Sequence, residues 1–299
     1  MRIRSIHWPV VTLGMLAVLA ALPVWTGPGL LNTRGGGDSP FLFFRVHQLA
    51  TNLHDGVFPA RWMPDAAYGL GYPFFNYYAA LPYYLGALFN LIGFDLLVSI
   101  KLVQTLGFVL AAWGMYRWAE RHTPTRSAAW LIAVAYTVAP FHLINVYVRG
   151  DSLSEFYAFV FYPLILLSID RIIASPRSFG WLALTYGGLI MTHNVSALIF
   201  SSFILLYAVT ALFKSAVGNR KSVMVSLALG WLFAFALSAW FWLPALGEAL
   251  RKLPLILREH AQSVPAGLLE NRPQGILGVA RGERRHPRAP VVDRKGQEV

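Results

Sequence analysis

The stretch LLVSIKLVQTLGFVLAAWGMYRW, Leu96 to Trp118, decides the fold class of this chain. Its charged side chains are Lys101 near the start and Arg117 near the end, and it exceeds the ~20 residues that a helix needs to cross hydrocarbon. Further runs of this kind are Pro9–Trp25, Ala128–Val148, Phe156–Ile173, Phe179–His193, Val195–Phe213 and Val223–Leu243. The pattern predicts an all-α, polytopic transmembrane helical bundle with about seven crossings, in which Phe179–His193 is a short one.

The overall composition agrees with a membrane protein. Hydrophobic residues make up 56% of the 299 positions and charged residues 13%, and the mean hydropathy is +0.52, outside the usual range for a soluble domain. The net charge of +11 comes from basic residues that mostly flank apolar runs, as topology signals do. We therefore expect no nucleic-acid binding. The absence of cysteine excludes disulfides and cysteine-ligated metals.

The apolar patch Ala79–Phe94 determines the predicted topology. If it crossed the membrane, the basic clusters at 117–126, 171–177 and 214–221 would face outward, against the positive-inside rule. We therefore predict that it does not cross. The N-terminus is then cytoplasmic, and a first loop at about 27–95 lies outside. The run Pro9–Trp25 also fits a signal peptide, but no clean small-x-small cleavage site follows it, which favours a first transmembrane helix.

The predicted first outer loop is too long for a simple connector and should have its own structure. In GGGDSPFLFFRVHQLATNLHDG, Asp38 or Ser39 suits an N-cap and Pro40 a first-turn position, so an amphipathic interfacial helix should end near Gly56. The following FPARWMPDAAYGLGYPFFNYYAALPYYLGALF is rich in Tyr, Trp and Phe. Such rings favour the headgroup layer, so this segment should lie along the outer leaflet.

Acidic residues next to the apolar runs are the candidate catalytic groups. The segment VRGDSLSEF, Val148 to Phe156, places Arg149, Asp151 and Glu155 at the outer surface beside the first loop. They have a structural interpretation, in which Asp151 or Ser152 caps a helix, Glu155 completes a capping box and Arg149 anchors at headgroups. The other interpretation is catalytic, since carboxylates from this segment and from Asp38 could take a proton or hold a divalent cation.

Other polar residues are candidate substrate ligands. His193 and Asn194 follow a short apolar helix and would need a cavity at membrane depth, although a histidine there is also a common structural residue. Arg45 and His47 lie on the predicted interfacial helix, where Arg45 could meet phosphate. Lys101 can snorkel or contact a lipid phosphate. Because the chain has no Walker loop, HExxH or Rossmann pattern, we expect no soluble nucleotide chemistry and assign no metal ligands.

The composition changes sharply near the C-terminus. All 10 Trp, 13 Tyr and 20 Phe residues lie at or before Trp242. We expect a membrane domain at 1–250 and a basic, disordered tail at 251–299. The change predicts a truncated or frame-shifted reading of a longer gene; a natural basic tail is the alternative.

Several ordered motifs resemble a known superfamily. GGGD at 35–38, FRVHQL, the aromatic segment above, AYTVAPFHLINVYVRGDSLSEF at 135–156 and MTHN at 191–194 resemble the GT-C superfamily of polyprenyl-phosphate-sugar glycosyltransferases. They are most similar to a bacterial branch labelled pyruvoyl-tetrahydropterin synthase-related membrane proteins. The label carries no pterin chemistry here, because the soluble synthase uses a histidine-bound zinc and no matching histidine pattern occurs. The resemblance covers about residues 1–250, and unlike such enzymes the chain loses membrane character after Leu243.

The resemblance implies an integral membrane enzyme that takes a sugar from a polyprenyl-phosphate donor at the outer face and inverts the anomeric carbon. Asp38 would then be the base, Asp151 and Glu155 the second acidic motif, and Arg149 a ligand of the donor phosphate. The partners are membrane lipid and the lipid-linked sugar, and the oligomeric state stays open. The alternative is a non-catalytic membrane protein, either a transporter or flippase component or a scaffold for envelope assembly. Ionisable residues at one face favour the enzyme, because transporters place polar groups near the midplane.

Overall fold

The computed structural model describes residues 8–30, 39–149, 152–214 and 219–263. Within these ranges every regular element is a helix, which confirms the predicted all-α class. The helices are α1 (Trp8–Trp25), α2 (Ser39–His54), α3 (Phe74–Tyr77), α4 (Leu81–Leu91), α5 (Leu96–His122), α6 (Arg126–Thr137), α7 (Pro140–Tyr147), α8 (Leu153–Ala174), the 3₁₀ turn η1 (Pro176–Ser178), α9 (Phe179–Thr192), α10 (Asn194–Lys214) and α11 (Arg220–Ser263).

Six helical segments in the described chain are long and apolar enough to cross a membrane: α1, α5, α6 with α7, α8, α10, and Arg220–Lys252 of α11. They match six of the seven predicted crossings and confirm a polytopic bundle. The remaining predicted crossing, Phe179–His193, corresponds to α9, which has 14 residues and is shorter than a full span. It still runs antiparallel to α8, because Thr185 contacts Ser168 and Gly188 faces Phe161.

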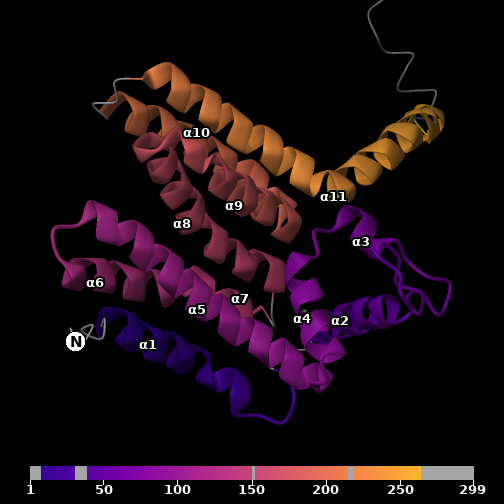
Figure 1. Cartoon of the computed structure of the whole chain (residues 1–299). Coiled ribbons are helices and arrows are strands. Elements are labelled where there is room, and N and C mark those ends of the chain that lie inside the picture. Colours follow the sequence, from indigo (N-terminus) through magenta and orange to yellow (C-terminus); the bar gives the residue numbers. More distant parts are fainter. Residues whose placement is uncertain (1–7, 31–38, 150–151, 215–218, 264–299) are drawn as a thin grey trace, which may run out of the picture. The chain divides into compact units, whose positions relative to one another are not determined.

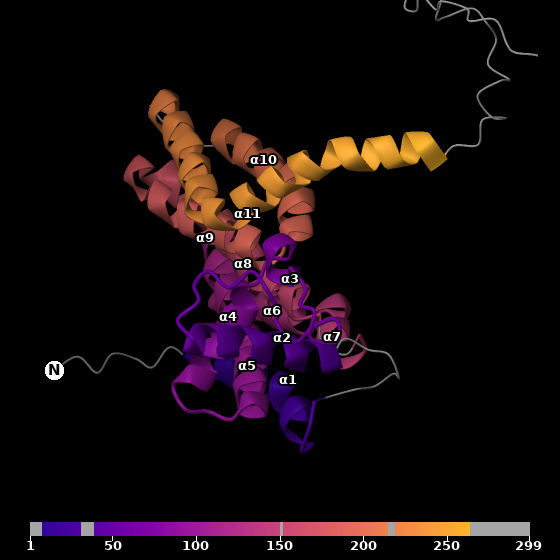
Figure 2. The ribbon, with the colours of Figure 1, turned by 90° about the vertical axis from the view of Figure 1, so that its right-hand side faces the viewer.

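The bundle has two ends with different contents (Figure 1). We call the first the loop end; it holds the end of α1, the start of α5 and the turn between α7 and α8. Lys101 Nζ donates to the Gly27 carbonyl there at 2.7 Å. The second is the basic end, where α5 finishes at His122 and α10 finishes at Lys214. The helices α2, α3 and α4 lie together at the loop end, as Figure 2 also shows.

The first loop is tied to itself and to the bundle by polar side chains. Gln48 of α2 accepts a hydrogen bond from the Asp65 backbone N–H at 2.9 Å, which holds the 61–72 segment against α2. Ser154 of α8 donates to the Ala79 carbonyl at 3.3 Å, and Arg61 donates to the Trp240 carbonyl of α11. The loop therefore packs against the starts and ends of several membrane helices instead of extending freely.

The third predicted crossing, Ala128–Val148, is not one continuous helix. It breaks into α6 and α7 at Val138 and Ala139. The cause is Pro140, which has no N–H to donate and disfavours helical geometry at the preceding residue. Freed by the break, the Thr137 carbonyl accepts a hydrogen bond from His142 Nδ1 at 3.0 Å. The interruption leaves α7 as a short separate helix that ends beside the start of α8.

Close contact between α5 and α8 depends on glycine. A Cβ atom at Gly107 would lie 2.3 Å from Phe156 Cε1 and 3.0 Å from Tyr157 Cε2. Phe156 and Tyr157 are buried, and Tyr157 donates to the Val103 carbonyl of α5 at 2.6 Å. The two helices can approach this closely because the small residue leaves room for the rings.

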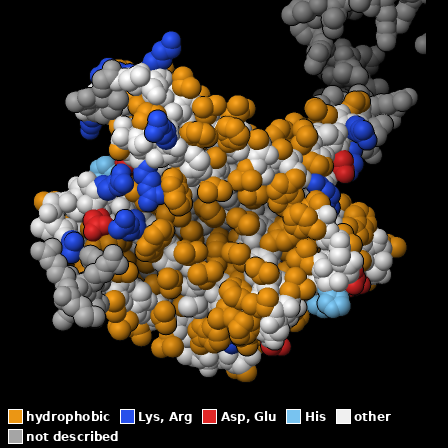
Figure 3. All heavy atoms as spheres, viewed as in Figure 1, with side chains coloured by type: hydrophobic (Ala, Val, Ile, Leu, Met, Phe, Trp, Pro, Cys, Tyr) orange, Lys and Arg blue, Asp and Glu red, His pale blue; other side chains and the backbone are white. Residues whose placement is uncertain are grey.

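The face of the bundle in Figure 3 is apolar over its middle, and Lys and Arg side chains gather at its left end. Large side chains such as Leu198, Phe203 and Leu232 are more than 60% exposed. A soluble monomer rarely exposes so continuous an apolar surface. This distribution fits helices whose outer sides contact lipid.

The N-cap of α5 provides a test of local stability. The Asp95 carboxylate accepts a hydrogen bond from the Leu97 backbone N–H at 2.9 Å. This N–H has no partner within the helix, because it belongs to the first turn. We expect Asp95→Ala to lower the free energy of unfolding by about 1 kcal/mol, and Asp95→Asn to change it by less. Thermal unfolding in detergent, followed by circular dichroism, measures both. Equal stability of the alanine variant and the wild type would contradict this role.

The chain divides into two compact units, Met1–Gly247 and Glu248–Val299. The described part of the second unit is the last portion of α11, in which Lys252 Nζ lies 3.8 Å from Glu248 Oε2. The tail predicted to be disordered began at residue 251, but α11 continues as helix through residues 251–263. The rest of the predicted tail, residues 264–299, lies outside the described residues.

Candidate functional site

The turn between α7 and α8 carries an ion pair at the loop end. Arg149 Nη1 donates to Asn145 Oδ1 at 2.9 Å and to the Glu155 carboxylate. The side chains of Arg149 and Glu155 are 44% and 22% exposed, so the pair is reachable from outside the bundle. Asn145 is fully buried, and its Nδ2 has no hydrogen-bond partner. The site thus combines an accessible cation, a carboxylate and an unused amide donor within one turn of chain.

A second turn, between α9 and α10, brings His193 to the same place. His193 Nδ1 lies 2.6 Å from Ser196 Oγ and accepts the Ser196 backbone N–H at 3.3 Å, so the imidazole caps α10. Burial lowers the pKa of His193; the Glu155 charge raises it and the Arg149 charge lowers it further. The two turns therefore lie within range of each other's charges. His193 should therefore be neutral at pH 7.

The arrangement differs from the structural interpretation of the VRGDSLSEF segment. Ser152 stands at the N-cap of α8 but makes no side-chain capping bond. Glu155 turns to Arg149 instead of returning to the N-cap, so the described residues do not form the capping box. The Ser152 backbone N–H donates to the Asn145 carbonyl at 2.9 Å, which closes the turn. Glu155 and Arg149 thus have a partnership that the sequence spacing alone did not predict.

Three predicted ligands lie in other surroundings. Arg45 sits over the ring of Phe74 at 4.5 Å and near that of Tyr78 at 5.5 Å, and it donates to Tyr83 Oη at 3.3 Å. Lys101 is nearly buried and holds the Gly27 carbonyl, an anchor for the end of α1. His47 lines a separate cavity of about 290 Å³ with His54. None of these contacts joins the Arg149–Glu155 pair.

The remaining predicted residues are placed only in part. Asn194 is the exposed first residue of α10, next to His193. Asp38 and Asp151 lie outside the described residues, although Ser39 begins α2 and Ser152 precedes α8. Among the described residues, no three or more His, Asp or Glu side chains group as a metal site would require. A divalent cation held by the two aspartates stays a hypothesis.

Sequence reasoning missed Asn145 and Ser196. Asn145 lies four residues before Arg149, one helical turn away, in an otherwise apolar stretch. A buried amide in such a stretch is costly, which is the signal that could have identified it. Ser196 lies three residues after His193, the spacing of an N-cap contact.

Comparison with known proteins places the sequence in context. Residues 75–255, more than half of the chain, match the family described as "6-pyruvoyl-tetrahydropterin synthase related domain; membrane protein". A protein of Lactococcus lactis subsp. cremoris (strain MG1363), described as "Uncharacterized protein", is 27% identical over 241 residues. That match covers 77% of this chain and 38% of the relative, so the chain spans well under half of the relative's length. The matched family region contains Arg149, Glu155 and His193.

Proposed function

This chain belongs to the 6-pyruvoyl-tetrahydropterin synthase related family of membrane proteins, and from that premise we propose that it is the N-terminal membrane part of a glycosyltransferase. The proposed reaction moves a sugar from a polyprenyl-phosphate donor to an acceptor at the outer face of a bacterial inner membrane. The donor and acceptor would meet at the loop end of the bundle.

The observation that supports this proposal most is the Arg149 guanidinium, an accessible cation held by Asn145 and Glu155. A guanidinium matches a phosphate through several N–H donors in a fixed plane. His193, which lies within range of the charges of this pair, could donate to the same oxygens. The first loop packs beside this position through Ser154 and Ala79, so an acceptor bound by the loop would be near the phosphate.

The proposed chemistry balances without a nucleotide. The acceptor hydroxyl loses its proton to a carboxylate, which by the family resemblance is Asp38, and its oxygen forms a bond to the anomeric carbon. The bond from that carbon to the phosphate oxygen breaks on the opposite side, so the configuration inverts. The phosphate leaves with the electron pair, and Arg149 stabilises its charge. Glu155 positions the guanidinium throughout.

Binding of the donor lipid directly tests the role of Arg149 as a phosphate ligand. We expect Arg149→Gln to weaken binding of a polyprenyl phosphate by about tenfold to a hundredfold, since a charged hydrogen-bonded contact is worth about 1.5–3 kcal/mol. Arg177→Gln, which removes an arginine at the basic end, should leave it unchanged. Retention of the lipid by the purified protein in neutral detergent, measured by native mass spectrometry, reports the affinity. Equal retention by the two variants would contradict a donor site at Arg149.

A transfer assay with the same protein distinguishes an enzyme from a non-catalytic membrane protein. A transporter or flippase component could bind the lipid-linked sugar but would release it intact. Incubation of the reconstituted protein with a polyprenyl-phosphate sugar and cell-envelope acceptors, followed by analysis of the sugar's anomeric configuration, tells them apart. Donor bound without any sugar transferred would overturn the proposed reaction and favour the alternative.

A further inference from the structure

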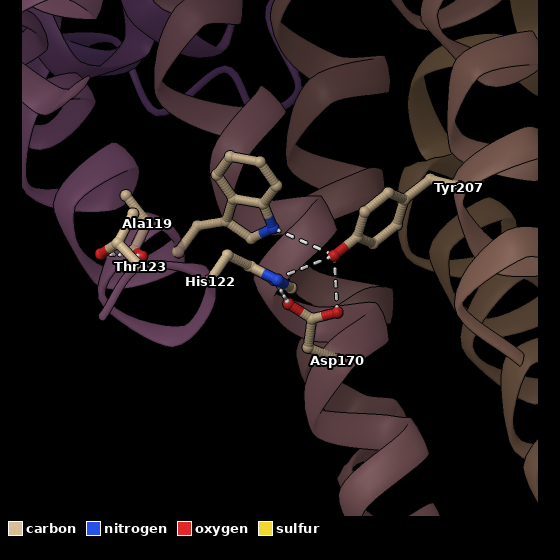
Figure 4. A network of polar contacts seen from close by, with 6 residues as sticks. Ala119, His122, Thr123, Asp170 and Tyr207 are labelled. Atoms are coloured by element: carbon tan, nitrogen blue, oxygen red, sulfur yellow. Dashed lines mark hydrogen bonds and ion pairs between the residues drawn. The ribbon is translucent and has the colours of Figure 1, made fainter. Parts of the chain in front are cut away.

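A polar network joins three helices at the basic end of the bundle (Figure 4). The proposed donor site is at the other end, the loop end. Asp170 of α8 is at its centre. Its Oδ2 lies 2.8 Å from His122 Nε2 of α5, and its Oδ1 accepts from Tyr207 Oη of α10 at 2.7 Å. Trp118 Nε1 donates to the same Tyr207 oxygen at 3.2 Å. Both carboxylate oxygens therefore have partners, and the network fixes the His122 ring between the helices.

A cavity of about 560 Å³ opens beside this network. Arg121 and Lys214 contribute cations to its lining, Thr210 a hydroxyl, and Ile173 and Ala211 an apolar side. The His122 side chain is 44% exposed at this cavity, whereas that of Asp170 is 12% exposed. The cavity therefore offers cations outward while its carboxylate is turned into the network.

The surrounding charge is strongly one-sided. The described side chains of this end include eight basic residues against the acids Glu120 and Asp170; the basic residues are Arg117, Arg121, Arg126, Arg171, Arg177, Lys214, Arg220 and Lys221. Glu120 is already engaged by Arg117 at 3.1 Å and by Arg126 at 3.9 Å. Arg171 lies near enough to Arg121 and Arg117 for their charges to act on it. An added anion would relieve this repulsion.

We propose that this cavity is a binding site for a phosphate-bearing group, separate from the proposed donor site. Arg121 and Lys214 contact the phosphate oxygens, and His122, held in place by Asp170 and Tyr207, forms part of the cavity wall. The apolar side formed by Ile173 and Ala211 suits the start of an acyl chain. Basic pockets between membrane helices bind anionic headgroups in this manner. A free phosphate has the same oxygen chemistry.

Matched double variants test the site. Arg121→Gln with Lys214→Gln removes the two cations of the cavity, and Arg220→Gln with Lys221→Gln removes the same residue types from the start of α11, which does not line it. We expect the first pair to weaken retention of phosphatidic acid about 30-fold, at a factor of about five per charge. The second pair should change it by less than about threefold. Native mass spectrometry of the full chain measures retention.

Two further arms identify the source of the phosphate. In neutral detergent, inorganic phosphate replaces chloride at equal ionic strength, and the thermal unfolding midpoint is compared for wild type and the cavity variant. Stabilisation of the wild type alone assigns the site to soluble phosphates; retention of phosphatidic acid without that stabilisation assigns it to lipid headgroups. The proposal is overturned if both double variants weaken retention equally, or if phosphatidylcholine is retained as well as phosphatidic acid.

Discussion

Replacing Gly107 by leucine is expected to disrupt the membrane bundle. A Cβ at this position meets Phe156 Cε1 at 2.3 Å and Cζ at 2.9 Å. Phe156 cannot move aside easily, because it is fully buried, packs edge-on against Phe108 with ring centroids 4.8 Å apart, and stacks on His142 at 4.6 Å. The remaining side-chain atoms of leucine have no space, so α5 and α8 must separate. We expect a loss of at least about 3 kcal/mol in the free energy of unfolding.

The matched control is Gly14→Leu in α1, where nothing lies within 4 Å of an added Cβ. This change should be neutral or slightly stabilising, since leucine favours the helix by somewhat less than about 1 kcal/mol over glycine. Unfolding in detergent with increasing dodecyl sulfate, followed by circular dichroism, measures both variants. If the two leucine variants unfold at the same midpoint, the close contact of α5 with α8 is not what stabilises the bundle.

Asp38→Asn has the largest expected effect on activity. In the proposed reaction this carboxylate takes the proton of the acceptor hydroxyl, a role typically worth 10²–10⁴-fold in rate. Asparagine keeps the shape and the capping ability of aspartate but cannot accept the proton at pH 7. Transfer should therefore fall by that factor, whereas folding and donor binding should persist. The initial rate of sugar transfer by the reconstituted protein measures the effect.

Two further variants test whether the loss of transfer is specific to Asp38. Asp55→Asn changes another acid of the first loop, one that lies 66% exposed beside His54, and it should leave transfer unaffected. Glu155→Gln should lower transfer less than Asp38→Asn, by about tenfold, because it weakens the hold on Arg149 without removing the base. Full transfer by both Asp38→Asn and Glu155→Gln would remove these carboxylates from the mechanism.

Much of the helical order was predictable from local patterns. The start of α2 next to Asp38, Ser39 and Pro40, and its end before Gly56, followed from capping and first-turn preferences. The limits of α5 were harder to predict: the helix continues past Trp118 to His122, since Arg117 and Arg121 can leave the hydrocarbon without ending the backbone bonds. The break before Pro140 was missed because an apolar run was given more weight than a proline inside it.

The pairings within the candidate site could not be predicted because they depend on how separate turns meet. The charge pattern placed Arg149 and Glu155 in one segment, but their contact requires the short α7 to end beside α8. Arg45 looked free for phosphate, yet the chain returns through Phe74 and Tyr78 and covers its guanidinium with rings. The spacing of residues along the sequence does not show where the chain folds back over an earlier residue.

The capping contact of His193 restricts what its imidazole can do. A backbone N–H can only donate, so the Ser196 amide requires Nδ1 of the ring to be unprotonated. The neutral ring must then carry its hydrogen on Nε2, and that tautomer can give a hydrogen bond to an oxyanion but cannot accept a proton there. In the proposed reaction, His193 would thereby be suited to solvate the departing phosphate and unsuited to deprotonate the sugar hydroxyl, which would leave that task to a carboxylate.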